Sequence, residues 1–144
     1  MNQHPNSSPM HISLYVGDVA KTQQFYDQLF ESAPSKVKPG YLKYELANPN
    51  LIISFVQHPE KAGSNFGHLG WKVASSETLQ RYLDLAQKAG LEVLEEKETD
   101  CCYARQQKFW VSDPDGYRWE VYHFIQDVEQ NDAPKLAQAG ISCC

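Results

Sequence analysis

The chain has 144 residues, of which 42% are hydrophobic and 12% aromatic, so it suits one compact domain and is too short for two ordinary ones. Thirteen Lys and Arg against eighteen Asp and Glu give a net charge of −5, so we expect no nucleic-acid partner and no anionic membrane surface. No apolar run could cross a bilayer, and residues 1–9 lack the basic and apolar parts of a signal peptide, so we expect a cytoplasmic protein.

The first half of the chain predicts a helix that packs against strands. Residues 11–16 alternate polar and apolar side chains, as a half-buried strand does, and Asp18 follows as a helix N-cap. The apolar stripe of that helix consists of Phe25, Tyr26, Leu29 and Phe30. Two more strands are predicted over 41–46 and 51–56, with the turn Asn48-Pro49-Asn50 between them.

The second half repeats this order. Residues 68–73 alternate like the first strand, and Ser75 or Ser76 caps a second helix. Its apolar stripe consists of Leu79, Tyr82, Leu83 and Ala86. Further strands are predicted over 91–94, 109–111 and 117–124, the last of them after the turn Asp113-Pro114-Asp115-Gly116. Overlaying the two halves places His11 on His68, so the chain contains an internal repeat.

This repeat predicts an α+β fold of two βαβββ modules, about residues 10–62 and 67–125. Neither module can cover both faces of its sheet alone, so we expect them to complete one domain over 10–125. We expect residues 1–9 and the tail 126–144 to be mobile.

Three predicted strands each place one potential metal ligand on the face that does not pack under a helix: His11, His68 and Glu120. Two imidazoles and one carboxylate with open coordination positions suit non-haem Fe(II). In the first half, the position equivalent to Glu120 falls near Phe55, so we expect no fourth protein ligand.

The plainer interpretation of these residues stays open at this point. A strand histidine is more often a solvated or hydrogen-bonded side chain than a metal ligand, and Glu120 could be an exposed carboxylate. Metal binding by His11, His68 and Glu120 is favoured because the repeat places the three residues together. His58 and His123 lack this relation, and we interpret them as non-ligands.

The four cysteines form two adjacent pairs, Cys101-Cys102 and Cys143-Cys144, a spacing that fits neither a disulfide scaffold nor a zinc site. Two neighbouring thiols can chelate a soft atom, and the alternative is a chance doublet or a redox-sensitive pair. Adjacent residues of a regular strand point to opposite faces, so a chelating pair is expected in a turn or irregular loop, which the polar run 95–100 permits. Nearby, Arg105 and Lys108 could attract an anion, but we favour solvated loop charges.

Several segments together resemble the vicinal oxygen chelate superfamily, which includes glyoxalases, bleomycin-resistance proteins and extradiol dioxygenases. The segments Gly67-His68-Leu69-Gly70 and Asp113-Pro114-Asp115-Gly116, with Trp119-Glu120 after them, carry the superfamily resemblance. The segment Cys101-Cys102-Tyr103-Ala104 is more specific. It resembles the carbon–arsenic lyases that degrade trivalent organoarsenicals, a group that also includes cadmium-induced proteins.

The resemblance implies a role for each matching residue. His11, His68 and Glu120 match the iron ligands of the family, and Cys101 and Cys102 match its arsenic-binding pair. The implied reaction is an Fe(II)- and O2-dependent cleavage of the carbon–arsenic bond in methylarsonous acid or trivalent aromatic arsenicals. The product would be arsenite, and the implied role is arsenic detoxification.

Two other functions stay open. The first is a non-catalytic protein that sequesters cadmium or arsenite through its two thiol pairs, including Cys143 and Cys144 in the tail. The second is a glyoxalase-type enzyme that uses a divalent metal as a Lewis acid. The expected partners of the lyase are a small organoarsenical and O2, and the chain is expected to be a monomer or a homodimer.

Overall fold

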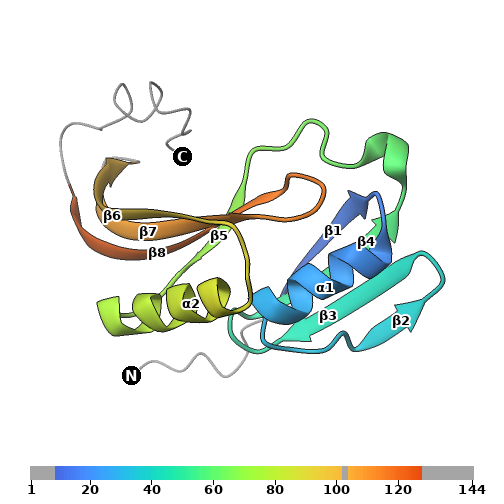
Figure 1. The fold of residues 1–144 in the computed structure, drawn as a ribbon, viewed down its shortest axis with the longest axis horizontal. Helices are drawn as coiled ribbons and strands as arrows, with labels where there is room; N and C mark the ends of the chain where they lie inside the picture. Colours follow the sequence, from blue (N-terminus) through green and yellow to red (C-terminus); the bar gives the residue numbers. More distant parts are fainter. Residues whose placement is uncertain (1–8, 102–103, 128–144) are drawn as a thin grey trace. The chain divides into compact units, whose positions relative to one another are not determined.

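The computed structural model describes residues 9–101 and 104–127. The N-terminal segment and the tail that were expected to be mobile fall almost wholly outside these ranges, and Cys143 and Cys144 lie there too. The chain divides into two compact units, residues 1–65 and 66–144, which are called unit 1 and unit 2 (Figure 1). Among the described residues, no helix is both long enough and apolar enough to cross a membrane.

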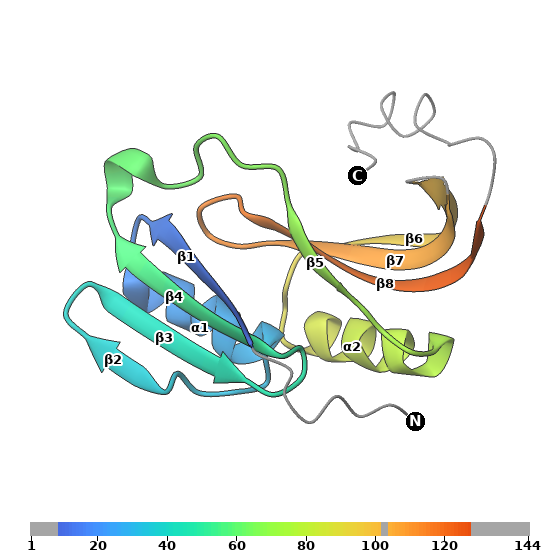
Figure 2. The same ribbon diagram turned by 180° about the vertical axis from the view of Figure 1, so that it is seen from behind.

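Unit 1 is a four-stranded mixed sheet with one long helix. Its elements are β1 (Met10–Val16), α1 (Val19–Leu29), β2 (Lys36–Lys38), β3 (Tyr41–Leu46), β4 (Leu51–Gln57) and the short 3-10 helix η1 (Pro59–Lys61). The strand order is β1-β4-β3-β2, in which β1 pairs with β4 in parallel and the other neighbours are antiparallel (Figure 2).

Helix α1 begins and packs as its sequence predicts. Asp18 is the N-cap, and its Oδ1 accepts hydrogen bonds from the backbone N–H groups of Ala20 and Lys21. The helix buries Tyr26 against Phe55 of β4, with ring centroids 4.3 Å apart. Aromatic contact of this kind makes up much of the core of unit 1.

A partly buried hydrogen bond joins α1 to β3. The Tyr44 hydroxyl, in a fully buried side chain, donates to Asp27 Oδ1 at 2.8 Å. Burial raises the pKa of Tyr44, and the bond to Asp27 raises it further. The phenol is therefore held in its neutral, donating form.

Unit 2 repeats the order of unit 1. Its elements are β5 (Leu69–Lys72), α2 (Ser76–Lys88), β6 (Val93–Cys101), β7 (Ala104–Ser112) and β8 (Arg118–Asp127). The strand order is β5-β8-β7-β6, in which only the β5–β8 pair is parallel. Ser75 is the N-cap of α2, since its Oγ accepts from the Thr78 N–H at 3.1 Å, and Gly90 follows the helix with a φ of +75°.

The strand predicted over 91–94 lies at 93–101 in the structure and so includes the polar run 95–100. Strand β6 runs through this segment to Cys101, with one irregularity in its pairing between Glu96 and Thr99. β6 is the edge strand of its sheet, and edge strands often carry charged side chains that discourage pairing with other chains. The polar run therefore marks an edge strand, and β7 is correspondingly longer than the three residues predicted for it.

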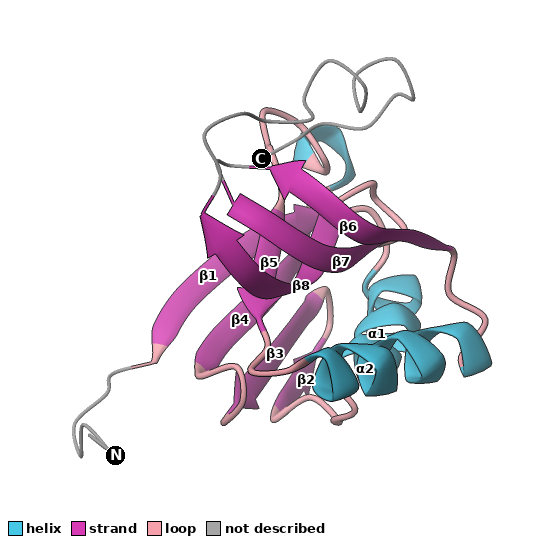
Figure 3. Cartoon of the chain, turned by 90° about the vertical axis from the view of Figure 1, so that its left-hand side faces the viewer, coloured by secondary structure: helices cyan, strands magenta, loops and turns pink. Residues whose placement is uncertain are grey.

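The predicted fold class is confirmed. Each unit contains a strand, a helix and three further strands, and the two units form separate four-stranded mixed sheets (Figure 3). That the two modules complete one domain around a shared site stays a prediction.

Candidate metal and thiol site

The predicted faces of the site strands are confirmed. In β8, Trp119 and Val121 are buried, whereas Arg118, Glu120 and Tyr122 alternate with them and are only partly buried. In β1, Leu14 and Val16 are buried, whereas His11, Ser13 and Tyr15 are exposed. In each sheet the candidate ligands thus lie on the face opposite the buried residues.

Two of the three candidate ligands meet within unit 2. His68 Nε2 lies 3.6 Å from Glu120 Oε1, and the two side chains are 21% and 13% exposed. The rings of His68 and Trp110 pack edge to face, with their centroids 5.1 Å apart. This contact limits the positions that the His68 imidazole can adopt.

A glycine makes room for the Glu120 side chain. Gly70 pairs with Glu120 across the parallel β5–β8 ladder. A Cβ atom on Gly70 would lie 2.4 Å from Glu120 Cγ and 2.6 Å from the Glu120 carbonyl oxygen. In the sequence, Gly70 belongs to the segment Gly67-His68-Leu69-Gly70, and a glycine inside a strand is itself a sign of close approach.

Lys108 belongs to the candidate site, and the prediction of a solvated loop charge is wrong for it. We favoured a solvated loop charge, but Lys108 lies in β7, is 1% exposed, and places its Nζ 3.1 Å from Glu120 Oε2. The cation is stable there because a carboxylate compensates it. Glu120 therefore has one oxygen held by Lys108 and the other directed at His68.

Tyr122 adds a hydroxyl to the same face of β8. Burial raises the pKa of Tyr122, and the nearby Glu120 carboxylate raises it further. The phenol consequently stays neutral at ordinary pH and can donate a hydrogen bond.

Unit 1 contains a matching arrangement that lacks the carboxylate. Ser13 pairs with Ser54 across the parallel β1–β4 ladder, as Gly70 pairs with Glu120 in unit 2. Ser54 Oγ lies 3.5 Å from His11 Nε2, so a serine occupies the position equivalent to Glu120. The sequence overlay pointed near Phe55, one residue further on, whose fully buried side chain belongs to the core.

The chemistry and spacing of the pair in unit 2 fit a metal ion. Two ligands that bind one ion at about 2.1 Å each lie at most about 4 Å apart, and the separation of 3.6 Å meets this limit. Within neither unit do the described residues bring three potential metal ligands together. His11 belongs to unit 1, so its participation stays a prediction.

Cys101 is the last residue of β6 in unit 2. Cys101 pairs with Ala104, and the preceding pair, Asp100 and Arg105, is joined by two hydrogen bonds of 2.9 and 3.1 Å. Arg105 is therefore engaged in an ion pair, where we expected a solvated charge. The Cys101 side chain and the whole of Cys102 lie outside the described residues, so the arsenic chelate stays a prediction.

The end of the β6–β7 pair that contains Cys101 lies far along the sheet from His68 and Glu120. Trp110, which pairs with Glu120, is six residues from Ala104 along β7, a path of about 20 Å in a regular strand. The sheet of unit 2 curls at this end, as Figures 1 and 2 show. If the thiols capture a substrate, this separation must be bridged before the substrate reaches Glu120.

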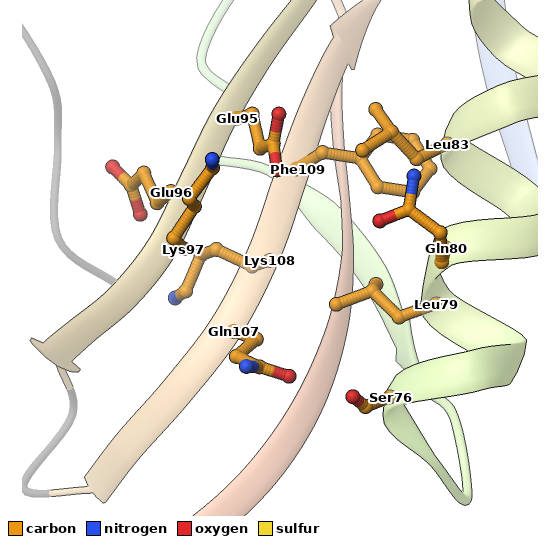
Figure 4. Close-up of a pocket in the computed structure, with 10 residues that line it drawn as sticks. All are labelled: Ser76, Leu79, Gln80, Leu83, Glu95, Glu96, Lys97, Gln107, Lys108 and Phe109. Carbon is orange, nitrogen blue, oxygen red and sulfur yellow. The ribbon is translucent and has the colours of Figure 1, made fainter.

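A pocket of about 300 Å³ opens between α2 and strands β6 and β7 (Figure 4). In this view Lys108 and Glu96 extend away from α2, whereas Phe109 points toward the helix residue Leu83. The pocket lies mainly on the helix side of the sheet, although Lys108, which contacts Glu120, is one of its lining residues.

The sequence matches the family model described as the Glyoxalase/Bleomycin resistance protein/Dioxygenase superfamily over residues 8–121. A trivalent organoarsenical cleaving enzyme of Bacillus sp. (strain MD1) is 39% identical over 122 residues, which cover 84% of this chain and 76% of the relative. A protein of the same name from Thermomonospora curvata is 36% identical over 137 residues, covering 95% and 87%. The cadmium-induced protein CadI of Mycobacterium bovis is 38% identical over 122 residues, covering 85% and 80%.

The solved structures support the same fold. A glyoxalase/bleomycin resistance protein/dioxygenase from Alicyclobacillus acidocaldarius matches with a TM-score of 0.70 at 12% identity, covering 86% of this chain and 96% of that one. At this identity the likeness concerns the fold alone. Together with the sequence matches, it shows that the chain belongs to the glyoxalase/bleomycin resistance protein/dioxygenase superfamily.

Proposed function

We propose that this protein is an Fe(II)- and O2-dependent carbon–arsenic lyase that converts trivalent organoarsenicals to arsenite. The substrates would be methylarsonous acid and trivalent aromatic arsenicals, and the role would be arsenic detoxification in the cytoplasm. The single observation that carries the proposal is the His68–Glu120 pair, which lies on the ligand face of a chain similar to named organoarsenical cleaving enzymes.

His11, His68 and Glu120 would hold the iron, and the iron would supply the activation of dioxygen when bound. The residues around the pair support this role. Lys108 holds Glu120 Oε2 and so leaves Oε1 as the oxygen that faces His68. Gly70 keeps the space that the Glu120 side chain occupies.

Cys101 and Cys102 would capture the substrate, because trivalent arsenic is soft and prefers thiolate sulfur. Binding would displace the thiol protons, so the affinity should fall at acid pH. After capture, the arsenic would have to cross the path of about 20 Å along β7 to Glu120. Holding it there in register with the metal residues can contribute up to about 7–11 kcal/mol to the reaction in favourable cases. The carbon–arsenic bond would then be broken with O2 as the oxidant. The arsenic would leave as arsenite, with an oxygen in place of its carbon, and the carbon group would leave in oxidised form.

Sequestration of cadmium or arsenite is the second candidate, and the relatives named cadmium-induced protein favour it. A binder would need only its thiols. It would not need a histidine and a carboxylate facing each other at 3.6 Å, with a buried lysine on the second carboxylate oxygen. A glyoxalase-type reaction is the third candidate, and the Cys101-Cys102 pair argues against it.

The decisive assay incubates Fe(II)-loaded protein with methylarsonous acid or phenylarsonous acid, in air and without oxygen. Arsenite is measured by chromatography with elemental detection, and oxygen uptake by an electrode. The lyase should form arsenite only in air. Without arsenite from either substrate, sequestration becomes the better explanation.

Variants separate capture from cleavage. His68→Ala should abolish turnover and leave arsenical binding largely intact, whereas Cys102→Ser should weaken binding first. His58→Ala is the matched control, since His58 is interpreted as a non-ligand. Loss of binding in His68→Ala with turnover unchanged would contradict the assigned roles.

A further inference from the structure

A pocket of about 340 Å³ lies at the start of β6 in unit 2, next to the candidate metal residues. It is lined by Glu92, Val93, Leu94, Trp110, Ser112 and Arg118. Trp110 joins the pocket to the site, because it pairs with Glu120 across the β7–β8 ladder and its ring contacts His68. Arg118 lies two residues before Glu120 on the same face of β8, about 7 Å away along the strand.

Arg118 has hydrogen-bonding capacity that the described residues leave unused. Its guanidinium carbon lies 4.4 Å from the centroid of the Trp110 ring, a cation–π contact that uses none of its N–H donors. No described carboxylate pairs with Arg118, and Glu92, which also lines the pocket, is exposed. A guanidinium fixed in this way presents a planar fork of N–H donors that suits a carboxylate or another planar anion.

The residues that line the pocket around Arg118 suit an aromatic ring. Leu94 is 44% exposed and so offers a hydrophobic surface to a ligand. Trp110 is 3% exposed, and its indole N–H has no hydrogen-bond partner among the described residues. A buried donor without a partner is costly, so a bound acceptor group that reached it would relieve this cost.

From this arrangement we propose that the pocket binds the aryl part of the substrate and selects aromatic arsenicals that carry an anionic ring substituent. The arsenic end would lie toward His68 and Glu120, and the ring would lie along Leu94. Arg118 would donate hydrogen bonds to the anionic group. The backbone spacing of about 7 Å between Glu120 and Arg118 along β8 is comparable with the span of a benzene ring with a para substituent. This inference rests on the proposed function and names the substrate class for the same site.

The test compares phenylarsonous acid with 4-carboxyphenylarsonous acid, which differ only in the carboxylate. Binding is measured without iron or oxygen by tryptophan fluorescence titration, and kcat/KM with Fe(II) in air. Wild-type protein should favour the carboxylated compound, and Arg118→Met should reduce that preference roughly 10- to 100-fold, as expected for a hydrogen bond to a charged group. Arg118→Lys keeps the charge without the fork, so it should restore part of the preference.

Arg81→Met is the matched control, because the Arg81 guanidinium stacks on Tyr82 of α2 at 4.8 Å and does not line the pocket. It should keep the wild-type preference. Equal binding of the two compounds by wild-type protein, or an unchanged preference in Arg118→Met, would overturn the inference. If neither compound is cleaved but the binding preference depends on Arg118, the proposed lyase fails and the anionic aryl pocket stands.

Discussion

Replacing Gly70 by alanine tests how tightly the two strands enclose Glu120. The added Cβ would lie 2.4 Å from Glu120 Cγ and 2.6 Å from its carbonyl oxygen, whereas carbon atoms in contact are ordinarily about 3.5–4.0 Å apart. The side chain can turn away, but the carbonyl oxygen belongs to the backbone of β8 and is held by the β5–β8 pairing. The clash therefore has to be relieved by moving a strand, the carboxylate or both.

Overpacking of this kind typically costs about 1–3 kcal/mol, so the free energy of unfolding of Gly70→Ala should fall by that amount. Displacing the carboxylate should also weaken metal binding by roughly 10- to 100-fold, as is typical when the support of a ligand is lost. Urea unfolding of the metal-free protein measures the first effect. Calorimetric titration with Fe(II) under nitrogen measures the second.

Gly67→Ala provides the control, because a Cβ at Gly67 would meet no atom within 4 Å. Both glycines belong to the same four-residue motif, so the comparison isolates the contact with Glu120. If Gly70→Ala matched Gly67→Ala in both its urea midpoint and its metal affinity, the argument from close approach would be refuted.

Three further predictions concern single contacts. Glu120→Ala should lower the free energy of unfolding in urea by about 3–5 kcal/mol, because it leaves the buried Lys108 without its carboxylate. The double variant with Lys108→Met should recover most of this loss. No recovery would show that the ion pair is not the cause. Tyr44→Phe should cost about 1.5–3 kcal/mol at neutral pH through the lost bond to Asp27. The pKa of Tyr44 is raised above 10.0 in the folded protein, so this tyrosine ionises first in the unfolded chain. Above pH 10 the free energy of unfolding should therefore fall more steeply for the wild-type protein than for Tyr44→Phe. Parallel plots of the free energy of unfolding against pH would contradict this. Asp18→Ala should cost about 1 kcal/mol by removing the cap of α1, and unchanged thermal unfolding would argue against the cap.

The alternation of side chains predicted the candidate ligand face correctly from sequence. In β1 and β8, residues two positions apart share a face of the sheet. The apolar residues are buried on one face, so the residues that alternate with them, including His11 in β1 and Glu120 in β8, lie on the other face. This part of the inference needs only the period of a strand, which is a local property of the chain. The helix caps at Asp18 and Ser75 are local for the same reason.

The strand lengths of unit 2 were harder to predict. The polar residues 95–100 have no apolar alternation because β6 is an edge strand, and its pairing with β7 is made by backbone groups that every residue carries. Hydrophobic patterning reports burial, so it does not detect a strand whose side chains are largely exposed.

The sequence by itself determined the repeated order of elements, the faces of the strands and the residue types of the candidate site, because each depends on neighbours within a few positions. Only the tertiary structure decided which residues oppose one another: Gly70 and Lys108 beside Glu120, and Ser54 beside His11. These contacts depend on the register between strands that are distant in sequence. Register is set by the packing of a whole sheet, so no local pattern in the sequence encodes it.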